Sequence, residues 1–327
     1  MITKKSIVNH NYNIDILRLL LMTMIVLWHF YVHSYDINSK NIISETPILV
    51  SLILPLLCCH VNCFMTISGF FGVKFNLKKI LDFYLQLLFY SLGYAIISIT
   101  NNDTLYLNEF IANILMPYRL WWYAEIYIYI MLIGPLITMG MKCLNKKSQQ
   151  AIVILALIFI VIIPWLLGIA NFRMTMLVIY TCACYISINE SKILKKHSGK
   201  IFLLCIIVLI IMRIISINYN ILTLYNRTCS YSNPIVILSG ISLFSFFLNL
   251  KLNIHIPFLS HIIPGLFAVY LITDFESIRF LNHFIIDTIG PNPLLLLFPA
   301  IIICIVIGFI DTLRWRLFTK LTKKIKQ

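Results

Sequence analysis

An arginine and a histidine, Arg18 and His29, lie in the first long apolar segment of the chain, within the run NIDILRLLLMTMIVLWHF. At about 100° and about 1.5 Å per residue, their spacing is close to three helical turns and about 16 Å. Both side chains therefore project from one helix face. A neutral imidazole can take a proton from a hydroxyl, and a guanidinium can bind an anion or a polarised carbonyl. Because ionisable residues inside a membrane span are costly, the pair predicts a functional site.

Each residue also has a structural interpretation. His29 could be a buried histidine bonded to a neighbouring helix, and Arg18 could extend its charge to the membrane surface while pairing with Asp15, three residues earlier. We interpret Asp15 as the residue that orients Arg18 or as an acid that favours the start of the helix, and not as a catalytic group. His33 shares the face of His29 and lies nearer the outer surface, where it is expected to be interfacial or to contact an acceptor.

Two residues of later segments are further candidates. Ser68 is expected to allow close helix packing or to line an acyl path. Glu125 follows Trp122 by one helical turn and could bind acceptor hydroxyls or orient His29. By contrast, Arg213 is expected to extend its charge toward the outer surface from the end of its segment.

No metal site is predicted. The cluster of Cys58, Cys59, His60 and Cys63 resembles a ligand set, but a second ligand pair is missing from its spacing. Thiols inside apolar segments usually behave as small hydrophobic side chains. We therefore expect no bound cofactor.

The composition determines the class of protein. Of the 327 residues, 60% are hydrophobic and 12% are charged, and the mean hydropathy is +0.92. Soluble domains are about 25% charged. Apolar runs that do not alternate favour membrane-spanning helices over a barrel.

We predict an all-α polytopic membrane protein in which residues 1–327 form a single domain. About ten spans are expected, at roughly 14–34, 48–72, 80–100, 121–141, 150–168, 172–188, 201–217, 234–250, 258–273 and 293–313.

The basic residues predict that both termini are cytoplasmic. The segments expected on the cytoplasmic side hold Lys4 and Lys5, then Lys74, Lys78 and Lys79, then Lys142, Lys146 and Lys147, then Lys192, Lys195, Lys196 and Lys200, then Lys251 and the tail from Arg314 to Lys326. The opposite side holds Lys40, Arg119, Arg173, Arg227 and Arg279. The formal net charge of +14 therefore reflects topology and attraction to anionic lipid, and no nucleic-acid partner is predicted.

Five segments, in order, resemble the acyltransferase-3 family of membrane acyltransferases. They are Asp15 to His29 with the pattern D-x-x-R followed by histidine, VNCFMTISGFFGVKFNLKKIL (Val61 to Leu81), RLWWYAEIYIYIMLIGPLI (Arg119 to Ile137), GLFAVYLITDFESIRFLN (Gly265 to Asn282) and IDTLRWRLF (Ile310 to Phe318). The resemblance covers essentially the whole chain. It implies about ten spans, an acyl-CoA donor and a cell-surface saccharide acceptor. It also implies that His29 is catalytic and that Arg18 is catalytic or binds the donor.

The chain departs from the family pattern at two places. Thr273 stands where the family often has a histidine after Tyr-Leu-Ile. Lys78 and Lys79 stand in the loop where the family commonly has an Arg-x-x-Arg pattern. Lysine lacks the planar fork of arginine, so these two residues are expected to bind donor phosphates as point charges.

We therefore expect a membrane O-acyltransferase in a bacterial inner or plasma membrane. It would move an acyl group, acetyl by expectation, from acyl-CoA to a hydroxyl of a cell-surface polysaccharide or a lipid-linked saccharide. The alternative is a transporter or flippase of lipid-linked saccharides, which also needs many spans and buried polar groups. The concentration of charge in the first span and the missing internal repeat favour the enzyme. A passive scaffold would leave Arg18 and His29 without a function.

Overall fold

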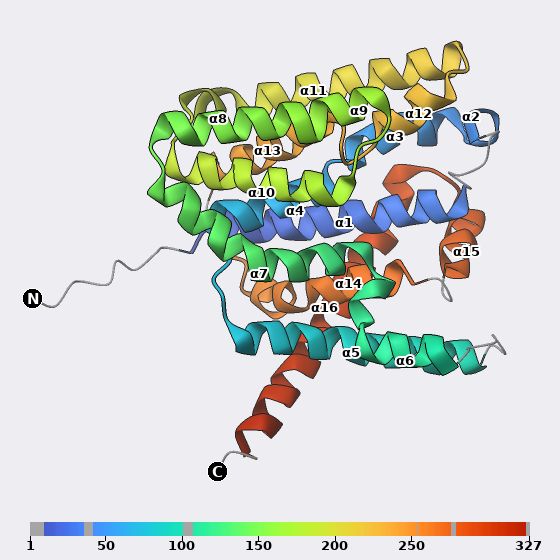
Figure 1. Ribbon diagram of the computed structural model, residues 1–327. Helices are drawn as coiled ribbons and strands as arrows, with labels where there is room; N and C mark the ends of the chain where they lie inside the picture. Colours follow the sequence, from blue (N-terminus) through green and yellow to red (C-terminus); the bar gives the residue numbers. More distant parts are fainter. Residues whose placement is uncertain (1–9, 36–41, 101–106, 253, 276–278, 325–327) are drawn as a thin grey trace, which may run out of the picture.

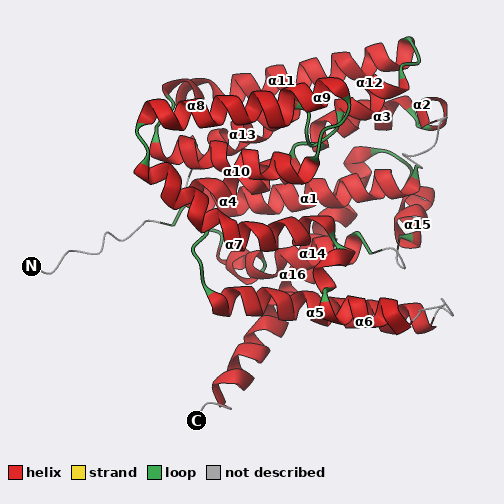
Figure 2. Ribbon diagram, viewed as in Figure 1, coloured by secondary structure: helices red, strands yellow, loops and turns green. Residues whose placement is uncertain are grey.

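The computed structural model describes residues 10–35, 42–100, 107–252, 254–275 and 279–324. Every regular element in these ranges is helical, which confirms the all-α class (Figures 1 and 2). Of the basic residues used to predict topology, Lys4, Lys5, Lys40 and Lys326 lie outside the described residues. The α-helices are α1 (Tyr12–Ser34), α2 (Ile42–Glu45), α3 (Ile48–Leu57), α4 (His60–Phe71), α5 (Leu77–Thr100), α6 (Leu107–Leu115), α7 (Trp122–Cys143), α8 (Lys146–Ala156), α9 (Ile163–Leu167), α10 (Phe172–Ile188), α11 (Lys192–Asn218), α12 (Leu222–Thr228), α13 (Pro234–Asn249), α14 (Leu266–Thr273), α15 (Phe280–Ile289) and α16 (Pro293–Lys324).

In the described part of the chain, seven helical segments are long and apolar enough to cross a membrane. They are Tyr12–Ser34, Ile48–Phe71, Leu77–Thr100, Trp122–Cys143, Lys146–Leu167, Lys192–Asn218 and Pro293–Thr319. Four shorter apolar helices accompany them, at Phe172–Ile188, Pro234–Asn249, Ile263–Thr273 and Phe280–Ile289. Each of the ten expected spans coincides with one of these helices, whereas the helix at Phe280–Ile289 was not expected. The multi-pass class therefore stands, and the count of ten stays a prediction.

The boundary between the fifth and sixth expected spans lies at Gly168. Helix α9 ends at Leu167, and Gly168 has φ = 77°, a left-handed conformation that glycine adopts without steric cost. Asn171 then accepts the backbone N–H groups of Arg173 and Met174 and so begins α10. The chain therefore reverses between two separate helices.

Consecutive long helices alternate in direction. The start of α1, the end of α4, the α7–α8 connection and the α10–α11 connection lie at one end, on the left in Figure 1. The end of α1, the α9–α10 connection and the α11–α12 connection lie at the opposite end. The lysines of the α7–α8 and α10–α11 connections thus share an end, as the expected topology requires. Which end faces the cytoplasm stays a prediction.

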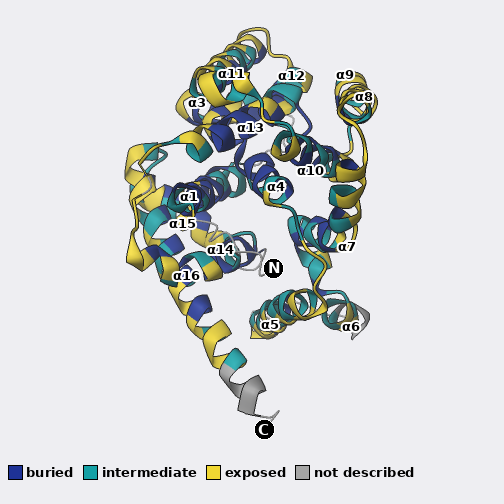
Figure 3. Ribbon diagram, turned by 90° about the vertical axis from the view of Figure 1, so that its left-hand side faces the viewer, coloured by how far each residue is buried: buried dark blue, intermediate teal, exposed yellow. Residues whose placement is uncertain are grey.

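Helix α1 lies inside the bundle. It packs against α3, α4, α13, α14, α15 and α16, and most of its residues are buried (Figure 3). Helices α5, α8 and α16 instead expose leucine, isoleucine and phenylalanine side chains, as helices that face lipid do. The helix that carries Arg18 and His29 is therefore surrounded by protein.

Candidate active site

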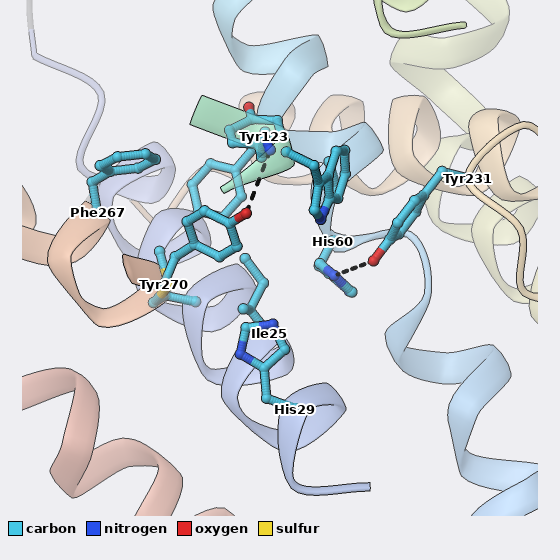
Figure 4. Close-up of a pocket in the computed structure, with 11 residues that line it drawn as sticks. Ile25, His29, His60, Tyr123, Tyr231, Phe267 and Tyr270 are labelled. Carbon is cyan, nitrogen blue, oxygen red and sulfur yellow. Dashed lines mark hydrogen bonds between the residues drawn. The ribbon is translucent and has the colours of Figure 1, made fainter. Parts of the chain in front are cut away.

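His29 lies on a small pocket between α1, α4, α7 and α14 (Figure 4). The pocket has a volume of about 50 Å³. Its walls are mostly apolar and aromatic. The residues that line it are Met22, Ile25, His29, His60, Val61, Phe64, Trp122, Tyr123, Tyr231, Phe267 and Tyr270.

A hydrogen bond from α14 fixes the imidazole of His29, which is only 7% exposed. Its Nδ1 lies 2.9 Å from Oγ1 of Thr273, and the Thr273 hydroxyl lies 2.8 Å from the carbonyl oxygen of Val269. The hydroxyl has one hydrogen and donates it to that carbonyl, so its oxygen accepts a hydrogen bond from Nδ1–H. This network assigns the tautomer in which Nε2 carries a lone pair. His29 thus has the form that a general base requires.

Arg18 occupies the same stripe of α1 as the pocket. Met22, Ile25 and His29 line the pocket at helical spacing, and Arg18 precedes Met22 by one turn. Its Nη1 donates to Oδ1 of Asp15 at 3.0 Å. The shared face of Arg18 and His29 and the partner role of Asp15 are therefore present in the fold.

Helices α4 and α7 approach Arg18 through a serine and a tyrosine. The Ser68 hydroxyl donates to the carbonyl oxygen of Phe64 at 3.1 Å, and its oxygen is in reach of the Tyr127 hydroxyl. Tyr127 also lies within electrostatic range of Arg18. Ser68 is therefore near the Arg18 end of the stripe and does not line the His29 pocket.

The other predicted site residues lie elsewhere. Glu125 forms an ion pair with Arg173 at 3.0 Å and accepts the Tyr129 hydroxyl, so its carboxylate is engaged away from His29. Lys78 and Lys79 are exposed on the first turn of α5. Lys78 borders a groove of about 240 Å³ between α5 and α16. The structure does not bring these three residues to the pocket.

His60 was missed as a site residue, because its neighbouring cysteines suggested only a metal cluster. The helix Ile48–Phe71 contains Pro55 and is interrupted at Cys58 and Cys59, so His60 begins α4 facing the pocket. Its Nδ1 donates to the carbonyl oxygen of Leu57 at 2.5 Å. Its Nε2 lies 3.5 Å from the Tyr231 hydroxyl, which is therefore the donor.

Tyr231 and Tyr270 were missed for a different reason, whereas Thr273 was noted only as a departure from the family pattern. All three come from segments far along the chain from His29, and no local pattern indicates that they meet it. Tyr270 accepts the backbone N–H of Tyr123 at 3.4 Å and so links α14 to α7 (Figure 4). Only the packing of α14 beside α1 brings these groups to one pocket.

Among the described residues, His29, His33 and Asp274 place ligand atoms within 4.8 Å of one another and could together hold a metal ion. One feature argues against it, because Arg279 lies 3.7 Å from Asp274 and already offsets the charge of that carboxylate. His33 Nε2 lies 3.3 Å from Asp274 Oδ1, in ion-pair range but outside good hydrogen-bond geometry. The absence of a metal stays a prediction.

Asp274 provides a negative charge beside the two histidines. Burial raises the pKa of its carboxyl group, but the interaction with His33 and the charges of the neighbouring imidazoles and Arg279 outweigh burial and lower it. The carboxylate is therefore ionised at neutral pH and sits where it can stabilise a protonated imidazole.

Residues 11–187, more than half of the chain, match the family model of the Acyl_transf_3 acyltransferase domain. The chain belongs to the acyltransferase-3 family. No curated protein and no solved structure matches the chain. The family segment includes Arg18, His29 and His60, whereas Tyr231, Tyr270 and Thr273 lie beyond it. The single domain over residues 1–327 stays a prediction. A single domain requires contacts between the matched segment and the rest of the chain, and the pocket contains residues from both.

Proposed function

We propose that this acyltransferase-3 protein is a cell-membrane O-acyltransferase. It moves an acetyl group from acetyl-CoA to a hydroxyl of a cell-surface polysaccharide or a lipid-linked saccharide. The observation that carries this proposal is the hydrogen bond between His29 and Thr273, which leaves Nε2 of His29 as a base on a small, largely apolar pocket.

In the proposed reaction, the acceptor hydroxyl gives its proton to His29 Nε2 while its oxygen attacks the thioester carbonyl carbon. The carbon–sulfur bond then breaks, and the imidazolium returns the proton to the departing CoA thiolate. Asp274 stabilises the transient positive charge on the imidazole. The protein is unchanged after one transfer.

The donor is proposed to approach from the end of α1 that carries Arg18. Asp15 holds the Arg18 guanidinium at 3.0 Å, and the stripe from Arg18 through Met22 and Ile25 leads to His29. The proposal requires the pantetheine arm to follow this stripe toward His29. Lys78 and Lys79 are exposed at the start of α5, where they can attract the phosphates of CoA from solvent.

The size of the pocket supports a short acyl group. One water needs about 10–15 Å³ of such space, so a pocket of about 50 Å³ holds a group of three or four heavy atoms. An acetyl group has three heavy atoms. A long acyl chain would require the aromatic walls to move.

Replacement of His29 tests the proposal. We expect His29→Ala and His29→Gln to lower acyl transfer by about 100-fold or more, the contribution of a general base. The measurement is mass spectrometry of surface polysaccharide from expressing cells, together with acetyl-CoA-dependent transfer in isolated membranes. His283→Ala is the control, because His283 is exposed on α15 and absent from the pocket. Normal transfer by a well-expressed His29→Gln protein would refute the role of His29.

A further inference from the structure

A second, larger cavity adjoins the His29 pocket. It has a volume of about 570 Å³ and lies between the C-terminal half of α1, α3, α11 and α12. Tyr231 lines both spaces, and the Trp28 ring centroid lies 5.6 Å from that of His60 and 6.4 Å from that of Tyr231. Sites for small organic molecules have volumes of about 300–1,000 Å³. The cavity is therefore large enough for a ligand that ends near His29.

Aromatic side chains form much of the cavity wall. Trp28 and Tyr31 project from α1, Tyr35 directly follows its last residue, and Tyr225 projects from α12. Such side chains offer an apolar face to ring C–H groups and polar edges to hydroxyl groups. Asn226 and Ser230 add hydrogen-bonding groups to the same wall. This mixture suits a saccharide better than an acyl chain.

Arg213 contributes a buried positive charge to this cavity. It was expected to extend toward the outer surface, but it is only 2% exposed and lies inside the bundle. Nη1 donates to the carbonyl oxygen of Tyr225 at 2.8 Å, and Nη2 donates to Sγ of Cys229 at 2.9 Å. The Nε–H group has no partner among the described residues. Within this part of the chain no carboxylate lies within 4.0 Å of Arg213, so its charge lacks a full counter-ion.

The guanidinium group is nevertheless held in place. Its central carbon lies 3.7 Å from the centroid of the Tyr225 ring, and the Tyr225 hydroxyl is anchored to Ser51 of α3 at 2.9 Å. A buried cation without an ionised partner is costly. Arg213 lines the cavity, and a fixed cation without a carboxylate partner among the described residues can bind an anionic ligand there.

Cys229 supplies part of the missing negative charge. Burial raises the pKa of this thiol, but hydrogen bonds with Cys58 and Arg213 and the guanidinium charge outweigh burial and lower it. A cysteine sulfur is a weaker partner for a guanidinium than a carboxylate or a phosphate group, so Arg213 retains capacity to bind a stronger anion.

We propose that this cavity is the acceptor subsite and that it takes an acidic saccharide, whose carboxylate or phosphate group binds Arg213. The role of the cavity as the acceptor subsite rests on the proposed function. Binding of an acidic saccharide at Arg213 does not, because it needs no acyl transfer. The aromatic wall and the shared Tyr231 favour a sugar over an anionic lipid headgroup. The sugar ring would lie along the α1 aromatics, with a hydroxyl directed toward His29.

A binding measurement without acyl-CoA tests this assignment. The full-length protein in phosphatidylcholine nanodiscs is titrated with cellobiouronic acid and with neutral cellobiose, followed by ligand-detected NMR. The acid should bind about tenfold or more tightly, the effect of one hydrogen-bonded charge. Arg213→Gln should reduce that preference to near unity. Arg227→Gln removes the same charge from α12 outside the cavity and should keep the preference.

Two further measurements keep the test decisive if Arg213→Gln folds poorly, as judged by its thermal unfolding. Asn226→Trp partly fills the cavity at an exposed position and should weaken binding of both disaccharides. Equal affinities for the two disaccharides, or binding of neither, would overturn the proposal. So would loss of acidic-disaccharide binding in nanodiscs that contain phosphatidylglycerol, because that result assigns Arg213 to a lipid headgroup.

The two proposals fail separately. His29→Ala should lose acyl transfer and keep the preference for the acidic disaccharide. Normal transfer by His29→Ala would refute the catalytic proposal and leave the acidic-saccharide site standing. If the wild-type protein transfers acyl groups fully but binds both disaccharides equally, the acidic-saccharide site is refuted and the catalytic proposal stands.

Discussion

At the scale of single residues, the tautomer of His29 depends on one hydroxyl group. Thr273 holds Nδ1 at 2.9 Å, and its own hydrogen is directed to Val269. Where the family resemblance implies a histidine, this chain thus uses a threonine as a hydrogen-bond acceptor. Thr273 is a positioning residue, because it acts through His29 and does not line the pocket.

Thr273→Val removes the hydroxyl and keeps the shape of the side chain. We expect acyl transfer to fall by about 10- to 100-fold, as when the partner of a functional histidine is lost. The KM for acetyl-CoA should stay constant. Thr273→Ser should restore most of the rate, since it supplies the same oxygen. Equal activity of the valine and serine variants would show that the hydroxyl does not orient His29.

Arg18 is the second test at this scale. Arg18→Lys keeps the charge but loses the planar fork that Asp15 holds. If Arg18 binds the donor, the variant should raise the KM for acetyl-CoA at least several-fold, measured by the rate of transfer in membranes. Unchanged donor affinity in Arg18→Ala would mean that the guanidinium only anchors the end of α1.

At the scale of helices, Gly69 sets the distance between α4 and α10. A Cβ atom at position 69 would lie 2.5 Å from the carbonyl oxygen of Tyr180 and 2.8 Å from Cβ of Ala183. Close helix approach through small residues is a common packing mode in membranes. This contact holds α4, and therefore His60, against the rest of the bundle.

Gly69→Ala should destabilise the protein by about 1–3 kcal/mol, because the backbone of α10 cannot move aside easily. The measurement is the thermal unfolding midpoint of the detergent-solubilised protein. Gly93→Ala on α5 is the matched control, since a Cβ atom there would have no neighbour within 4 Å. Equal midpoints for the two variants would show that α4 and α10 separate without cost.

At the scale of the whole molecule, the distribution of charge predicts the orientation. The α7–α8 connection, with Lys146, lies at the end of the bundle opposite Asn226 on α12 (Figure 1). In a background lacking the nine native cysteines, a cysteine placed at Asn226 should react with an impermeant maleimide added to intact cells. A cysteine placed at Lys146 should react only after the membrane is opened. Labelling of position 146 from outside would reverse the orientation and place Arg18 on the wrong side for acetyl-CoA.

The sequence by itself determined the membrane class, the helical architecture and the common face of Arg18 and His29. These features depend on hydropathy and on the 3.6-residue period, which are local properties of a segment. The positions of most expected spans follow for the same reason. Span lengths were less predictable, since the segment expected to span 258–273 begins with short 3-10 turns at Pro257–His261 and Ile263–Gly265, and its α-helix starts only at Leu266.

Only the tertiary structure decided which groups meet at the site. Thr273 reaches His29 across 244 positions of the chain, and Tyr231 reaches His60 across 171. Arg213 is buried because α12 and its Tyr225 fold over it, whereas its place near a helix end predicted exposure. Such contacts depend on which helix faces pack together. In a bundle whose helices are apolar on most sides, the sequence of one segment does not encode its neighbour.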